Sequence, residues 1–86
     1  MKESRQLEFK ETISNTFLKT VSAFANYDGG SILFGVNDNG EAVGISDIEQ
    51  KCLDIENSIN DSIKPQPEYS MEVINVGKTI PLNVHD

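Results

Sequence analysis

The chain has 86 residues and a formal net charge of −7, and 37% of its residues are hydrophobic. This length suits one small domain, and the charge has the wrong sign for a typical nucleic-acid-binding protein. The single cysteine, Cys52, excludes an intrachain disulfide framework and a cysteine cluster for zinc. No apolar run approaches the ~18 residues of a membrane span, and the first residues lack the apolar core of a signal peptide, so we expect a cytoplasmic protein.

The charge is distributed unevenly along the chain. Residues 1–20 contain four basic and three acidic side chains, whereas the remainder contains three basic and eleven acidic ones. Only the N-terminal segment therefore offers electrostatic attraction to a phosphate group.

The first half of the chain alternates between strand and helix patterns. Residues 7–10 alternate apolar and charged side chains, which predicts a short strand with Leu7 and Phe9 facing the core. From about Thr12, apolar residues recur at helical spacing, and they predict an amphipathic helix that ends before a pair of glycines. Residues 31–36 are apolar on both faces, as in a central strand.

The middle of the chain predicts a hairpin followed by a second helix. Residues 37–40 have strong turn chemistry, and we expect residues 41–45 to return as a strand. Residues 46–49 have the pattern of a capping box, and the regular apolar spacing after Ile48 predicts a helix that ends before Pro65.

Residues 69–76 and 79–84 are expected to form a second hairpin, which completes the order β-α-β-β-α-β-β. This order predicts an α+β domain with a mixed sheet of about five strands and two helices packed against it. The last strand would end near the C-terminus as an unpaired edge, which favours association. We therefore expect either a homodimer through the C-terminal edge strand or further domains in a longer parent chain. In the second case, residues 1–86 would be the N-terminal domain of that parent chain, truncated at its C-terminus.

Carboxylates near the first strand are candidate metal ligands. Glu3 and Glu8 have the oxygen chemistry that Mg²⁺ and Mn²⁺ prefer, and Asp38 joins them if the fold brings its turn beside them. The competing interpretation is that the two glutamates are solvated charges and that Asp38 stabilises its own turn.

The glycine-containing segments are interpreted as structural turns. They lack the lysine and hydroxyl residue of a P-loop, and the first follows the C-terminus of a predicted helix, whose dipole repels phosphate. The residues assigned to these turns are Asn26, Gly29, Gly30 and Gly40.

The order of the motifs carries more information than any one of them. Glu3-Ser4 with residues 7–10, then residues 19–26, 29–36 and 38–45, closely resemble the Schlafen AlbA-like domain. The resemblance is strong across residues 3–45 and weaker afterwards. The resemblance implies that the chain is the DNA-binding domain of a transcriptional-regulator-like protein. Some members of this family have names that refer to a divergent ATPase-like protein. One branch of the family cleaves RNA with three acidic residues and a metal ion, and these would correspond to Glu3, Glu8 and Asp38.

Three functions remain open. The favoured one, on the strength of the resemblance, is binding of nucleic acid, with DNA preferred over RNA, by the cations Lys2, Arg5, Lys10 and Lys19. The second is a ribonuclease that depends on Mg²⁺ or Mn²⁺, and this enzymatic role is the less favoured. The third is a non-catalytic dimerisation or docking module, which accounts best for the acidic total charge.

Overall fold

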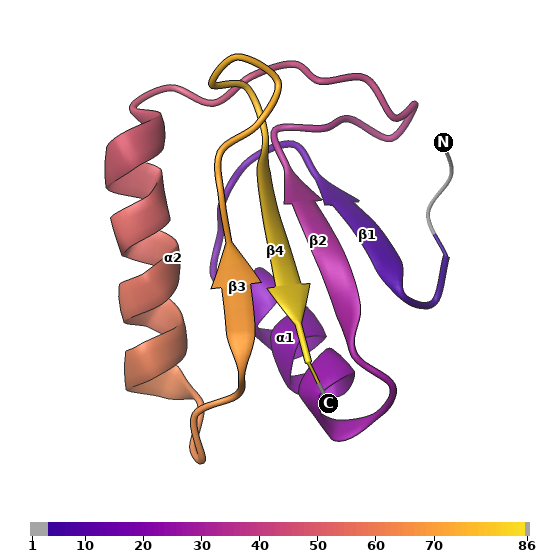
Figure 1. Ribbon diagram of the computed structural model, residues 1–86, viewed down its shortest axis with the longest axis vertical. Coiled ribbons are helices and arrows are strands. Elements are labelled where there is room, and N and C mark those ends of the chain that lie inside the picture. Colours follow the sequence, from indigo (N-terminus) through magenta and orange to yellow (C-terminus); the bar gives the residue numbers. More distant parts are fainter. Residues whose placement is uncertain (1–3, 86) are drawn as a thin grey trace.

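The computed structural model describes residues 4–85. In this part of the chain, four strands form one mixed sheet in the order β1-β2-β4-β3, with β1 parallel to β2 and the other pairs antiparallel. Figure 1 shows α1 behind the sheet and α2 beside it, beyond β3. The α+β class with two helices is confirmed, and the sheet has four strands rather than about five. The elements are β1 (Leu7–Lys10), α1 (Phe17–Asn26), β2 (Gly30–Phe34), α2 (Ile48–Ser62), β3 (Tyr69–Met71) and β4 (Ile80–Val84).

The expected strand at residues 41–45 does not form. Only an isolated bridge joins Val36 to Ala42, and Gly35, with φ of 85°, turns the backbone directly after β2. The side-chain oxygen of Asn37 accepts two backbone N–H groups of the following turn, each at 3.0 Å. These contacts close a tight local turn, and the segment continues as a loop instead of extending the sheet.

Helix α1 begins at Phe17, later than the apolar spacing from Thr12 predicts. The hydroxyls of Ser14 and Thr16 bond to each other at 2.9 Å, and the Thr16 side chain makes no capping bond to the helix. Small polar side chains that bond locally offer the backbone an alternative to a helical turn. Ile13 still packs against the core, although it lies outside the helix.

Helix α2 begins without the predicted capping box. Asp47 occupies the N-cap position in the left-handed conformation, with φ of 53°, and makes no side-chain capping bond. The amphipathic pattern itself is confirmed, because Ile55 and Ile59 are fully buried on the face of α2 that meets the core.

The core lies between the helices and one face of the sheet. Phe17 of α1 meets Phe34 of β2 edge to face, with ring centroids 5.4 Å apart. The buried residues of this core are Phe17, Val21, Phe24, Ile32, Phe34, Ile55, Ile59, Ile80, Leu82 and Val84. No helix between residues 4 and 85 combines the length and hydrophobicity needed to cross a membrane.

Phe9 is buried, as its inward placement predicted, but Leu7 and Phe9 lie on the other face of the sheet from this core. Paired residues of neighbouring strands lie on the same face, and Phe9 pairs with Leu33, whereas the core-facing residue of β2 is Ile32, which pairs with Glu8. Phe9 is only 5% exposed, but it is buried on the sheet face opposite the helices. The polar side of β1 therefore faces α1.

The second hairpin is confirmed, and the position expected for its last strand is wrong. β4 pairs with β2 along residues 80–84 and with β3 through residues 82–84, so this strand is central in the sheet and not an edge. The edges of the sheet are β1 and β3. A dimer through an exposed C-terminal edge strand therefore loses its structural basis.

Candidate nucleic-acid interface

The junction of β1 and α1 brings the polar side chains of β1 against the helix. The Oε2 atom of Glu8 accepts a hydrogen bond of 2.8 Å from the Thr20 hydroxyl and lies 3.6 Å from Nζ of Lys10. The Glu8 and Lys10 side chains are 34% and 29% exposed, so the pair is partly shielded from water. Thr20 thus orients the carboxylate, and the carboxylate in turn holds the ammonium group at the edge of the sheet.

Two further cations belong to the segments that form this junction. Lys19 is exposed on α1, next to Thr20 in sequence, and Arg5 is exposed two residues before β1 begins at Leu7. Arg5 reaches Asp28 at 3.9 Å, in a pair whose side chains are both mostly exposed. Exposed ion pairs contribute about 0–1 kcal/mol, so a phosphate group can compete for Arg5 at little cost. The fourth expected cation, Lys2, lies outside the described residues.

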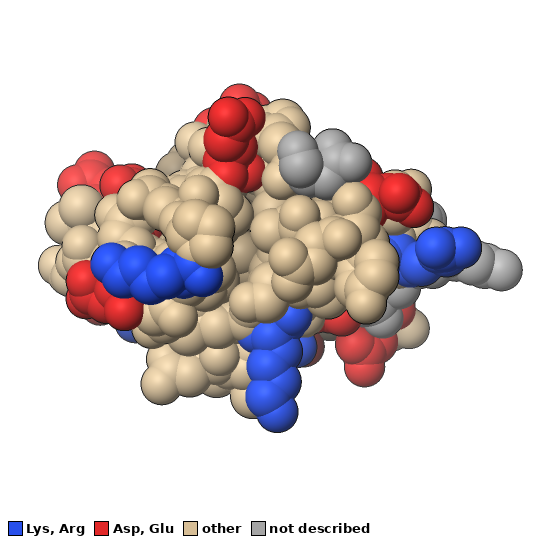
Figure 2. Space-filling view, turned by 90° about the horizontal axis from the view of Figure 1, so that it is seen from below, with Lys and Arg blue, Asp and Glu red and all other residues tan. Residues whose placement is uncertain are grey.

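The basic side chains visible in Figure 2 do not merge into a broad patch. On this end of the molecule they lie apart, separated by uncharged and acidic residues. Attraction of a polyanion at this end would depend on individual contacts rather than on a continuous positive surface.

The acidic candidates are not assembled into a metal site within the described residues. Across residues 4–85, no three histidine, cysteine, aspartate or glutamate side chains gather in a way that could hold a metal ion. Glu8 has Thr20 and Lys10 as its contacts, Asp38 is exposed in its turn, and Glu3 lies outside the described residues. Within residues 4–85, neither Glu8 nor Asp38 belongs to a cluster of side chains that could hold a metal ion.

The glycines after α1 support the turn into β2. Asn26 is the last residue of α1, and Gly29, with φ of 79°, donates its N–H to the Phe24 carbonyl at 2.9 Å. A Cβ at Gly30 would lie 2.8 Å from the Phe24 ring, so this position has room only for glycine unless the ring moves. Gly40, with φ of 83°, ends the Asn37 turn. None of these glycines opens a helix N-terminus, where a phosphate would bind.

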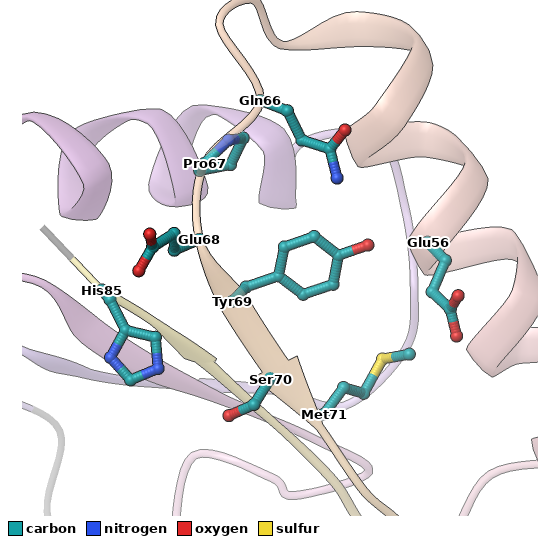
Figure 3. Close-up of a pocket in the computed structure, with 8 residues that line it drawn as sticks. All are labelled: Glu56, Gln66, Pro67, Glu68, Tyr69, Ser70, Met71 and His85. Carbon is teal, nitrogen blue, oxygen red and sulfur yellow. The ribbon is translucent and has the colours of Figure 1, made fainter.

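A groove between α2 and β3 is the feature that sequence reasoning missed. It has a volume of about 650 Å³, and Figure 3 shows Tyr69 near its centre. The Tyr69 hydroxyl donates a hydrogen bond of 3.4 Å to Asn60 of α2. No sequence motif signals this groove, because it exists only once β3 is known to be an edge strand.

Comparison with known proteins identifies the family. Residues 3–85 match the family model described as Schlafen, AlbA_2, and the chain belongs to this family. It is also similar to the uncharacterized ATP-binding protein UU034 of Ureaplasma parvum serovar 3, with 29% identity over 80 residues. The match covers 81% of this chain and 22% of that protein, so the chain spans about a fifth of the length of its relative.

Proposed function

We propose that this domain binds nucleic acid, preferentially DNA, along the edge formed by β1 and α1. The observation that carries the proposal is the junction at Glu8, where Thr20 donates a hydrogen bond to the carboxylate and Lys10 forms an ion pair with it, its side chain partly exposed at the sheet edge. A lysine held in this way loses less side-chain entropy when it binds a phosphate than a fully mobile lysine does. Arg5 and Lys19 would add contacts on either side.

The acidic remainder of the molecule would limit the orientation of binding. A polyanion is repelled from surfaces rich in carboxylates, so it approaches the one segment with an excess of cations. Contacts of this kind act on the backbone phosphates and do not distinguish base sequence. The domain would therefore supply affinity and orientation, and sequence preference would come from elsewhere.

The name of the Ureaplasma relative includes ATP binding, but this name describes a whole protein, and our chain spans only about a fifth of its length. The adjacent glycines of this chain, Gly29 and Gly30, follow the C-terminus of α1, where the helix dipole disfavours phosphate. We therefore assign the phosphate-binding role to the cationic edge and not to these glycines.

A ribonuclease that depends on Mg²⁺ or Mn²⁺ is the second candidate, and the partly shielded Glu8 carboxylate favours it. The carboxylate is already oriented by Thr20, as a metal ligand requires. This function would also need Glu3 and Asp38 beside Glu8, together with the cation.

Fluorescence anisotropy with labelled single- and double-stranded DNA and RNA, at two salt concentrations, tests the proposal. We expect salt-sensitive binding, with a logarithmic salt slope about one unit smaller in Lys19→Gln. Lys64→Gln is the matched control, because it makes the same change in charge at an exposed position between α2 and β3. Binding without salt dependence, or equal effects of the two variants, would contradict the proposed edge. Fragments that appear only with Mn²⁺, and are lost in Glu8→Gln, would instead support the ribonuclease.

A further inference from the structure

The β3 strand is an open edge of the sheet. Among the described strands it pairs only with β4. The bonds from His85 N–H to the Glu68 carbonyl (2.9 Å) and from Glu72 N–H to the Pro81 carbonyl (3.4 Å) show which backbone groups face β4. Because backbone groups alternate in direction along a strand, the N–H and C=O groups of Tyr69, Met71 and Val73 point away from the sheet. None of these groups has a hydrogen-bond partner within residues 4–85.

The groove of about 650 Å³ lies beside β3, on the side where another strand would be added. Figure 1 shows α2 lying beyond β3, so a strand added to β3 would pass along this helix. Figure 3 shows the Tyr69 and Met71 side chains pointing toward α2 and Glu56, whereas Glu68 and Ser70 point to the other side. An incoming strand would therefore meet an apolar side beneath α2 and a polar side opposite it.

The charges around β3 indicate which kind of segment would bind to this edge. Among residues 4–85, the side chains that line the groove include two carboxylates, Glu56 and Glu68, and no lysine or arginine. Glu72 adds an exposed carboxylate two residues beyond Ser70. Burial and, after it, the nearby Glu56 carboxylate raise the pKa of Tyr69.

A second copy of this chain is a poor occupant. Antiparallel pairing of two β3 strands centred on Ser70 would place Glu68 of each copy opposite Glu72 of the other. Like charges directly opposite each other destabilise a strand pair, and each copy also carries a net charge of −7. A basic strand avoids both the repulsion between opposed glutamates and the repulsion between two chains of net negative charge.

We propose that β3 binds an extended basic segment of a partner protein by strand addition. The outward backbone groups of Tyr69, Met71 and Val73 supply the ladder of hydrogen bonds. Apolar side chains of the segment lie beneath α2, and its alternate lysine or arginine side chains lie beside Glu68 and Glu72. This surface is at the opposite edge of the sheet from the proposed nucleic-acid interface, so either proposal can fail while the other stands.

A fluorescein-labelled peptide that alternates valine and lysine over seven residues tests this surface by fluorescence anisotropy with the full chain. We expect binding that weakens with salt, and no binding of the same peptide with glutamate in place of lysine. Val73→Pro removes an outward N–H without breaking a bond to β4, and it should weaken binding about tenfold. Val73→Ala keeps the N–H, and its affinity should stay within about twofold of the parent because Val73 is already 43% exposed.

The peptide provides a control that does not depend on any variant. N-methylation of the peptide amides that face β3 should also weaken binding about tenfold, even if Val73→Pro fails to fold by circular dichroism. Equal binding of the glutamate peptide, or no effect of N-methylation, overturns strand addition by a basic segment. A concentration-dependent dimer that disappears with Val73→Pro would also overturn it, because the occupant would then be a second copy.

Discussion

Replacement of Gly35 by alanine tests the turn that ends β2. Gly35 has φ of 85°, where an alanine costs about 1–2 kcal/mol. A Cβ at this position would overlap the Lys78 carbonyl oxygen and lie 2.9 Å from Cγ1 of Ile45. Its N–H donates to the Lys10 carbonyl at 2.7 Å and its carbonyl accepts from the Val43 N–H at 2.7 Å, so the backbone is held on both sides. Overpacking adds about 1–3 kcal/mol, which gives a total of about 2–5 kcal/mol.

Gly77→Ala is the matched control for this substitution. Gly77 has φ of 79°, but a Cβ there would meet no atom within 4 Å, so only the conformational cost of about 1–2 kcal/mol applies. Urea unfolding followed by circular dichroism should show Gly35→Ala to be less stable than Gly77→Ala by about 1–3 kcal/mol. Small domains have as little as about 5 kcal/mol of stability in total, so Gly35→Ala would approach unfolding. Equal losses in the two variants would refute the steric argument.

Two further predictions concern α2 and the groove. Ile59→Ala should lower the free energy of unfolding by about 2–5 kcal/mol, whereas Leu53→Ala, at a position 52% exposed on the same helix, should cost much less in the same urea assay. Glu56→Gln should lower the raised pKa of Tyr69 toward its ordinary value of 10.0, measured by ultraviolet titration of the phenol, because one cause of the shift is removed while burial remains. The folded pKa of Tyr69 is raised, so its contribution to stability is present below about pH 10 and is lost as the pH rises through the folded pKa. Because Glu56→Gln brings the folded pKa of Tyr69 closer to its unfolded value, the pH range over which this stability is lost should become narrower. An unchanged titration curve of Tyr69 would contradict Glu56 as a cause of the raised pKa.

Apolar periodicity predicted α2 and β2 well, although the local signals for a strand at residues 41–45 and for a capping box at residues 46–49 failed. The apolar spacing of α2 identifies a helix whose buried residues, Ile55 and Ile59, are those on the predicted stripe. The run that forms β2 is apolar on both faces, and this strand is indeed central in the sheet. These patterns suffice because one face of each element must be buried whatever its neighbours are.

Features that depend on pairing between distant segments were not predictable in the same way. The alternation in β1 shows its period, but the inward face follows from the register with β2, which carries apolar residues on both sides. The central position of β4 depends on its pairing with both β2 and β3. The same limit applies to the site: Glu8 and Lys10 were identified from the sequence, but Thr20, which bonds to Glu8 from twelve residues away, was not.

The sheet order places the proposed nucleic-acid contacts and the acidic β3 strand at opposite edges of the sheet. The cations Arg5, Lys10 and Lys19 belong to β1, its entry and α1, whereas Glu68 and Glu72 flank β3 at the opposite edge. Three strand spacings separate β1 from β3, which is about 14 Å. The Debye length at physiological ionic strength is about 8 Å, so the repulsion from the β3 edge is largely screened at β1. The net charge of −7 therefore describes the whole molecule and does not decide what the β1 edge binds. For the same reason, the acidic groove can attract a basic segment without competing with the cations of β1.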